Sequence, residues 1–230
     1  MDSYQFIVED LTKFYNGKKV LDIPHLTIKR GLIHGVIGPN GSGKTTLLTI
    51  LSFLVQPSSG RIIFNGLEVS SQLNDELALR REIAVVLQNP FLFNTTVEKN
   101  VAYGLKVRGM NKNVQKEKVS ECLDLVGLAG FERRRARELS GGEAQRVAIA
   151  RGIALNPEVL FLDEPATNVD NIHVEALERI IGELNHKYGT TVILTTHDVN
   201  QTYRIADDVI VLFEGEIKKI VSKDAFRSPL

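Results

Sequence analysis

The sequence has few of the features that mark a secreted or membrane-spanning protein. Its 230 residues contain one cysteine, Cys122, so no internal disulfide is available, and a reducing compartment fits. Residues 1–4 lack the basic and apolar regions of a signal peptide. No apolar run approaches the roughly 20 residues that cross a bilayer. We therefore expect a cytoplasmic protein, and any membrane that it serves must be spanned by another chain.

Tryptophan is absent, and neither sign of charge is in excess. The 28 Lys and Arg residues are balanced by 28 Asp and Glu residues, so no generally basic surface is indicated and no nucleic-acid partner is expected. There is also no Cys/His cluster that indicates zinc. The composition, with 43% hydrophobic and 24% charged residues, is that of a soluble globular chain.

The apolar pattern predicts an α/β fold. Strands are expected at residues 6–11, 26–28, 33–37, 61–64, 83–87, 159–162, 192–195 and 209–213, and helices at 44–54, 141–154 and 172–187. This alternation is typical of a mainly parallel sheet flanked by helices. Between about 97 and 128 the apolar residues recur at helical intervals instead. We therefore predict one domain over 1–230, with a core at about 1–87 and 156–230 and an inserted helical lobe at about 88–155.

Residues 38–45 match the pattern G-x-x-x-x-G-K-[ST] without a gap, between a predicted strand and a predicted helix. Glycines let backbone N–H groups converge on phosphate oxygens, and the helix start adds partial positive charge. Lys44 is expected to reach the β- and γ-phosphates, and Thr45 to ligate Mg²⁺. The predicted nucleotide-binding residues are Gly38, Pro39, Asn40, Gly41, Ser42, Gly43, Lys44, Thr45 and Thr46.

Two adjacent acids end the apolar run at 159–162. Ligands of parallel sheets bind at the carboxyl ends of the strands, where Asp163 and Glu164 stand. Successive strand residues point to opposite sides, so we expect the two acids to have different roles. Asp163 is predicted to hold Mg²⁺, and Glu164 to act as general base toward water.

Residues 139–146 read Leu-Ser-Gly-Gly-Glu-Ala-Gln-Arg, and Ser140 lies 23 positions before Asp163 (163 minus 140). Ser140 stands where a helix N-cap is expected, and Gly141 and Gly142 allow close backbone approach. This stretch resembles the signature sequence of ABC ATPases. The resemblance extends from residue 6 to about 221 and implies a P-loop NTPase with an N-terminal antiparallel β subdomain. It also implies that Ser140, Gly141, Gly142 and Glu143 contact the ATP held by a second, facing subunit.

The same resemblance assigns roles to isolated polar residues. Gln88, at the end of the predicted strand 83–87, matches the glutamine that senses Mg²⁺ and nucleotide. His197, after strand 192–195, matches the histidine that contacts the γ-phosphate and positions water. With Glu164 and Lys44, these are the predicted catalytic residues, and Thr45, Gln88 and Asp163 are the predicted metal-binding residues.

Two further resemblances are less complete. Tyr15 is similar to the aromatic residue that stacks on adenine, with Phe14 as a competing candidate. Asp170 matches the aspartate of the family's D-loop, but the preceding run Ala166-Thr167-Asn168-Val169 departs from the usual Ser-Ala-Leu. The fold is unaffected by this departure, whereas the detailed dimer contacts are left open.

The resemblance implies the motor subunit of a membrane transporter, peripheral on the inner face of the membrane. Its expected partners are permease subunits, a second ATPase subunit (a copy or a relative) and, indirectly, a solute-binding protein. Residues 89–93 are either a docking surface for the permease or part of the lobe's interior. Residues 94–105 and 140–146 resemble oxyanion importers of the tungstate or molybdate type. The alternative is a soluble ABC ATPase of translation or DNA maintenance.

Overall fold

The computed structural model describes residues 3–69, 76–166 and 171–223. The strands are β1 Tyr4–Tyr15, β2 Lys18–Lys29, β3 Ile33–Ile37, β4 Ser59–Phe64, β5 Leu67–Val69, β6 Ile83–Val86, β7 Val159–Asp163, β8 Thr191–Thr196, β9 Asp208–Phe213 and β10 Glu216–Ser222. The α-helices are α1 Lys44–Leu51, α2 Glu76–Arg81, α3 Val97–Val101, α4 Tyr103–Val107, α5 Lys112–Leu125, α6 Gly141–Ile153, α7 Asn171–Tyr188 and α8 Val199–Ile205. None of the helices within these ranges has both the length and the apolar character needed to cross a bilayer.

The larger sheet has six strands in the order β10-β9-β3-β8-β7-β6. Strands β3, β6, β7, β8 and β9 pair in parallel, and β10 is antiparallel to β9. Strands β3, β7 and β8 are buried along their whole length, as expected for a parallel sheet covered on both faces. The carboxyl ends of β3, β7 and β8 therefore lie side by side at one edge, and Gly38, Glu164 and His197 follow these ends.

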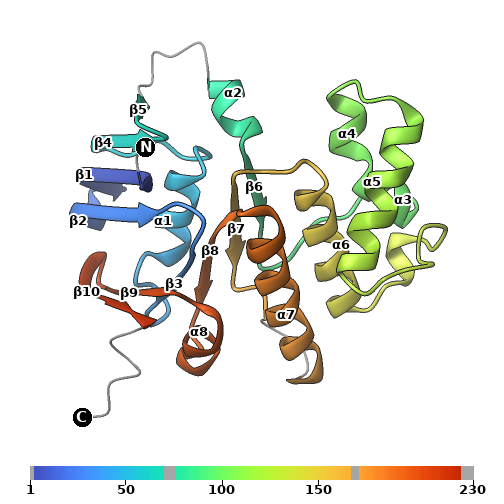
Figure 1. Ribbon diagram of the computed structural model, residues 1–230. Helices are drawn as coiled ribbons and strands as arrows, with labels where there is room; N and C mark the ends of the chain where they lie inside the picture. The colour runs from blue at the N-terminus through green and yellow to red at the C-terminus, as the bar shows by residue number, and fades with distance from the viewer. Residues whose placement is uncertain (1–2, 70–75, 167–170, 224–230) are drawn as a thin grey trace.

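The second sheet is antiparallel, with the order β2-β1-β4-β5. Its β1–β2 hairpin is longer than the short strands expected at 6–11 and 26–28, because a left-handed turn at Asn16 (φ 49°) and Gly17 (φ 79°) folds two 12-residue strands against each other. In Figure 1 this sheet lies beside α1, at the end of the molecule opposite α3–α5. The antiparallel β subdomain is thus present.

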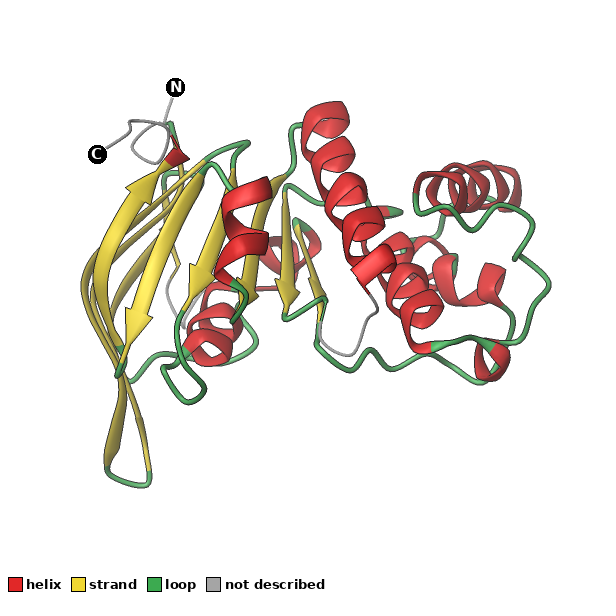
Figure 2. Cartoon of the chain, turned by 90° about the horizontal axis from the view of Figure 1, so that it is seen from below, coloured by secondary structure: helices red, strands yellow, loops and turns green. Residues whose placement is uncertain are grey.

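The two faces of the large sheet belong to separate hydrophobic clusters. One face packs with α1 and the antiparallel sheet, through residues such as Phe6, Leu48 and Phe161. The other face packs with α6, α7 and α8 and is continuous with the interior of the α3–α6 region, through residues such as Val101 and Leu160. Figure 2 shows the helices of this region gathered on one side of the strands.

Several helix boundaries have a local cause. Thr96 and Asn111 accept backbone N–H bonds at the starts of α3 and α5. The helix expected at 44–54 ends at Leu51, since Phe53 takes a left-handed conformation with φ 58°. Val114, in the first turn of α5, is 37% exposed, whereas Val119 and Leu123 farther along the helix are buried.

Candidate functional site

The loop between β3 and α1 ends at Gly43, the N-cap of α1. Gly43 has φ 102°, a conformation that side-chain-bearing residues rarely adopt. No side chain caps this helix, and the first helical bond runs from Leu47 N–H to Gly43 O at 2.8 Å. The N–H groups of Lys44, Thr45 and Thr46 in the first turn consequently have no partner within the helix. They are donors directed at the space before the helix.

The start of the loop is closely packed. A Cβ at Gly38 would lie 2.0 Å from the carbonyl oxygen of Leu212 on β9, so only glycine fits. Ser42 is 2% exposed, and its hydroxyl oxygen has no hydrogen-bond partner among the described residues. A buried hydroxyl without a partner beside free backbone donors is suited to an anionic ligand.

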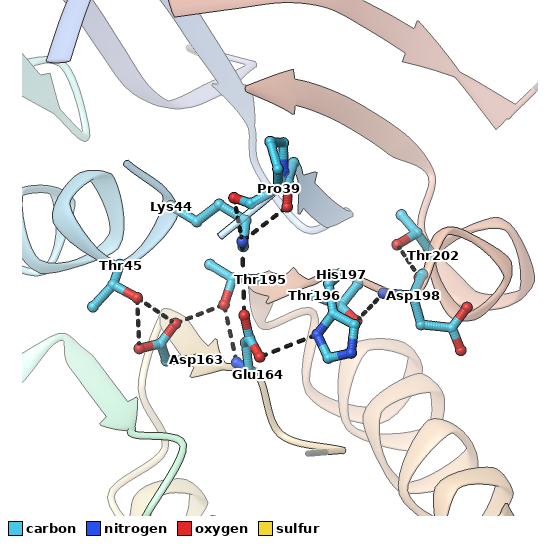
Figure 3. A network of polar contacts seen from close by, with 11 residues as sticks. Pro39, Lys44, Thr45, Asp163, Glu164, Thr195, Thr196, His197, Asp198 and Thr202 are labelled. Carbon is cyan, nitrogen blue, oxygen red and sulfur yellow. Dashed lines mark hydrogen bonds and ion pairs between the residues drawn. The ribbon is translucent and has the colours of Figure 1, made fainter. Parts of the chain in front are cut away.

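Lys44 is buried, with 6% of its surface exposed. Its ammonium group donates to the carbonyl oxygens of Gly38 (2.9 Å) and Pro39 (3.3 Å) and lies 3.7 Å from Glu164 Oε1 (Figure 3). The Lys44 ammonium group thus contacts both the phosphate loop and Glu164, the residue that follows β7.

Asp163, the last residue of β7, is held by two hydroxyl groups. Thr45 Oγ1 donates to both carboxylate oxygens at 3.1 Å, and Thr195 Oγ1 donates to Oδ1 at 2.7 Å (Figure 3). Asp163 is 5% exposed, so these contacts lie in a largely buried setting. The carboxylate and the Thr45 hydroxyl form a pair of oxygen donors of the type that Mg²⁺ prefers.

Glu164 follows β7 in a left-handed conformation, with φ 44°. The two acids do have different partners, but strand alternation is the wrong reason, because Glu164 lies beyond the strand end. Its N–H donates to Thr195 Oγ1 (2.9 Å) and Thr195 O (3.1 Å), which fixes the turn. Its carboxylate faces Lys44 and His197, whose Nδ1 is 3.2 Å from Glu164 Oε2. Unfavourable backbone conformations of this kind are concentrated at functional sites.

His197 lies between β8 and α8. Asp198, the N-cap of α8, accepts bonds from the N–H groups of Asn200 and Gln201, and this cap fixes the turn that carries the imidazole. The His197 side chain is 62% exposed, so it remains accessible from the cavity side.

These elements surround one cavity of about 680 Å³. It brings together the phosphate-loop residues, Gln88 after β6, Glu164 after β7 and His197 after β8. Its lining residues are Val20, Asn40, Gly41, Gly43, Lys44, Thr45, Thr46, Gln88, Glu164 and His197. Sequence motifs more than 150 positions apart therefore meet in one place (197 minus 40 is 157).

Other predicted site residues among the described ones lie outside this cavity's lining. Ser140 caps α6, as predicted, and forms a reciprocal capping box with Glu143: Glu143 N–H donates to Ser140 Oγ (3.3 Å), and Ser140 N–H donates to Glu143 Oε2 (2.8 Å). Gly141 has open space around its Cβ position. Tyr15 and Phe14, 45% and 44% exposed, stand at the end of β1. Asp170 lies outside the described residues.

Thr195 is a site residue that the motifs did not single out. It is fully buried, and it connects Asp163 and Glu164 through its hydroxyl group. The available signal was its place at the end of β8, because β8 pairs in parallel with β7 and sets Thr195 opposite Asp163.

The comparisons with known proteins agree with this geometry. The ABC transporter family model matches residues 21–167, more than half of the chain. The tungstate uptake system ATP-binding protein TupC of Peptoclostridium acidaminophilum is 38% identical over 93% of this chain and 96% of its own length. The Fe(3+) ions import ATP-binding protein FbpC 1 of Haemophilus influenzae is 38% identical over 100% of this chain and 70% of its own.

Solved structures show the same fold. The cbiO1 protein of Clostridium perfringens, part of the ABC transporter complex cbiONQ, superposes with a TM-score of 0.91 at 30% identity, covering 98% of this chain and 91% of that one. The ATP-binding cassette MJ0796, in a dimeric post-hydrolysis state bound to ADP and Pi, has a TM-score of 0.87 at 30% identity, with 95% and 98% covered. The chain therefore belongs to the ABC transporter family, as an ATP-binding subunit that hydrolyses ATP.

Proposed function

We propose that this chain is the ATPase motor of a membrane importer and that the 680 Å³ cavity is its nucleotide site. The observation that carries the proposal is the meeting of the phosphate loop, Gln88, Glu164 and His197 around one cavity. Each of these groups has a separate task in phosphoryl transfer, which depends on positioning and charge stabilisation.

The phosphate loop binds and orients the nucleotide. The free N–H groups at the start of α1 and the Lys44 ammonium bind the phosphates, and the partnerless Ser42 hydroxyl adds a polar contact. Thr45 and Asp163, which are hydrogen-bonded to each other, and Gln88, which lines the same cavity as Thr45, supply oxygen donors of the kind that fit Mg²⁺. When bound, Mg²⁺ would neutralise charge on the phosphates.

Glu164 is the general base in this proposal. Its carboxylate is 15% exposed, lines the cavity and contacts His197. It accepts a proton from the attacking water, and His197 holds that water and the terminal phosphate in position. The carboxylate of Glu164, which follows β7 with a left-handed backbone, lies 3.7 Å from Lys44 Nζ.

The adenine ring needs an aromatic surface beyond the phosphate loop. Val20 of β2 lines the cavity, and Tyr15 pairs with Lys18 nearby on the same hairpin. We propose Tyr15 as the stacking residue, supported by its exposure of 45% and by its place on the hairpin whose Val20 lines the cavity. Phe14 is the competing residue, and separate alanine substitutions with ATP affinity as the readout distinguish the two.

The working unit is proposed to be a head-to-tail dimer. Ser140, Gly141, Gly142 and Glu143 do not line the cavity of their own chain, so they are available to the nucleotide of a second copy. Asp170 is assigned to the same interface from the sequence resemblance. Dimeric arrangements of the related cassette MJ0796 support this assembly.

The permease is proposed to dock beside Phe91 and Phe93. Phe91 is 75% exposed and Phe93 36%, and their rings lie 5.9 Å apart. Both line a groove of about 620 Å³ that is also lined by arginines, so we expect an apolar segment with acidic residues. The arginines of the groove are Arg80, Arg81, Arg108 and Arg151. The groove joins β6 to the α3–α6 region, so the lobe at about 88–155 is the proposed moving part. Through this contact with the permease, the protein is proposed to be peripheral to the membrane.

The double substitution of Phe91 and Phe93 by alanine tests this contact. We expect it to weaken permease binding while ATP binding is retained, because neither ring lines the nucleotide cavity. Leu67→Ala is the matched control, since Leu67 is 66% exposed on the distant β5. Loss of ATP binding together with permease binding would refute the assignment of this surface.

The solute is proposed to be an oxyanion of the tungstate or molybdate type. The tungstate relative supports this, as do the phosphate import relative of Natronomonas pharaonis (40% identical over 88% of this chain) and a probable sulfate/thiosulfate relative of Chlorella vulgaris. The iron import relatives give Fe(3+) as the competing solute.

Purification of the tagged protein from detergent-solubilised membranes of its source tests the transporter assignment. We expect a polytopic membrane protein to co-purify. The solute-binding protein of that complex is then titrated with tungstate, molybdate, sulfate, phosphate and Fe(3+), and tightest binding of tungstate or molybdate is expected. Recovery of soluble chains, ribosomes or DNA alone would contradict the transporter role and favour the soluble alternative.

A further inference from the structure

Glu143 places a negative charge at the start of α6, where the proposed function requires an anion to bind. It is the third residue of the helix, and one of its oxygens is used in the cap of Ser140. The pKa of Glu143 lies below its ordinary value, first because of the hydrogen bond from the Ser140 backbone, and further because of the Ser140 side chain and the nearby Arg134. The carboxylate is therefore ionised, and it would repel a phosphate brought to the same helix end.

Arg134 supplies the compensating charge. Its Nη1 donates to Glu143 Oε1 at 3.2 Å, so the two carboxylate oxygens are shared between Arg134 and the Ser140 N–H. The guanidinium also lies 4.2 Å from the centre of the Phe131 ring, a cation–π contact that limits its rotamers.

The backbone around Arg134 is also held by hydrogen bonds. Its carbonyl oxygen accepts the N–H of Val97 (3.0 Å), and the N–H of Ala136 donates to Thr95 O (2.9 Å). Thr96 forms an isolated β-bridge with Arg135 in the same crossing. The segment that precedes the signature is thus attached to the segment that leads from Gln88 into α3, and Arg134 is held in position before any partner arrives.

We propose that Arg134 is a positioning residue for the ATP-bound dimer: it neutralises Glu143 and so lets the Ser140 helix end face the phosphates of the partner subunit's nucleotide. This inference rests on the proposed head-to-tail dimer. Arg134 is then needed for ATP-dependent dimer formation only while residue 143 carries a negative charge. Arg134 itself touches neither nucleotide in this proposal.

A double-mutant cycle tests the inference. The protein carrying Glu164→Gln, which is expected to stop hydrolysis, is titrated with ATP, and dimer formation is followed by sedimentation velocity. Arg134→Gln is expected to raise the half-maximal ATP concentration roughly tenfold, a coupling typical of interacting charged neighbours. In a protein that also carries Glu143→Gln, which keeps a carbonyl oxygen for the Ser140 N–H, the same Arg134→Gln change is expected to cost less than about threefold.

Arg133→Gln is the matched control, because Arg133 is an exposed neighbour with the same charge. ATP binding by the monomer and the thermal unfolding temperature are measured for each variant, and both are expected to be unchanged by Arg134→Gln. An equal loss with and without the Glu143→Gln change would overturn the inference, because it would indicate a direct phosphate contact or a folding role. Failure of the Glu164→Gln parent to form dimers with ATP would instead refute the head-to-tail dimer, and this inference with it.

Discussion

Replacement of Glu164 by glutamine separates ATP binding from ATP hydrolysis. The side chain is 15% exposed, and its carboxylate contacts His197 Nδ1 at 3.2 Å and lies 3.7 Å from Lys44 Nζ. Glutamine has nearly the same size and keeps an oxygen for these contacts, so the cavity is expected to stay intact. It cannot accept a proton from water. The expected loss in kcat is therefore about 10²- to 10⁴-fold, the usual contribution of a general base.

The same substitution should not weaken nucleotide binding. It removes one negative charge from a cavity that receives phosphates, so ATP affinity is expected to stay equal or to increase. Phosphate release measures hydrolysis, and equilibrium dialysis measures binding. Glu158→Gln is the matched control, since Glu158 immediately precedes β7 at its other end and pairs with Arg30. A kcat within about threefold of the wild-type value would refute the assignment of Glu164 as the base.

Single contacts elsewhere in the chain give three further predictions. Gly38→Ala should lower the free energy of unfolding by about 1–3 kcal/mol and abolish ATP binding, because the added Cβ would lie 2.0 Å from the carbonyl oxygen of Leu212. Calorimetric melting measures the first effect and ATP titration the second. Gly141→Ala is the folding control, because a Cβ at Gly141 meets open space. Burial raises the pKa of the Cys122 thiol to about 12, so iodoacetamide at pH 8 should label it only after denaturation, and rapid labelling of the native protein would contradict this burial. Hydrogen bonds from Tyr188, Lys187 and Lys118 lower the pKa of Glu121 from 4.5 to about 2, so its stabilisation is present above pH 4.5 and is lost as the pH falls toward 2. Because Glu121 is 36% exposed, Glu121→Gln should lower the free energy of unfolding by only about 1 kcal/mol at pH 7. Denaturant titrations should find that this difference vanishes near pH 2. A difference that stays constant with pH would refute the linkage.

The sequence predicted most of what depends on local spacing. The strand before Gly38, the helix after Gly43 and the cap at Ser140 follow from glycine positions, apolar periodicity and capping preference within about ten residues. The parallel sheet then follows from the order of the elements, and it places the residues after β7 and β8 at one edge.

Features that depend on distant contacts were not predictable in the same way. The left-handed backbone of Glu164 is fixed by Thr195, a residue 31 positions later in the chain, through bonds to its backbone and hydroxyl oxygens. The Arg134–Glu143 pair requires the crossing of two loops near Val97. Neither leaves a periodic signal, because each depends on loop positions that are set by tertiary packing.

In the proposed dimer, ATP joins the phosphate loop of one subunit to the signature helix of another. Cysteines placed at Asn40, which is exposed in the cavity, and at Gly141, where added atoms meet open space, test it directly in a protein carrying Cys122→Ala. A short bis-maleimide cross-linker is added with ATP, with ADP or without nucleotide, on the Glu164→Gln background. Covalent dimers are expected with ATP, and not with ADP or without nucleotide. Dimers formed equally in all three conditions, or no dimers with ATP, would contradict it.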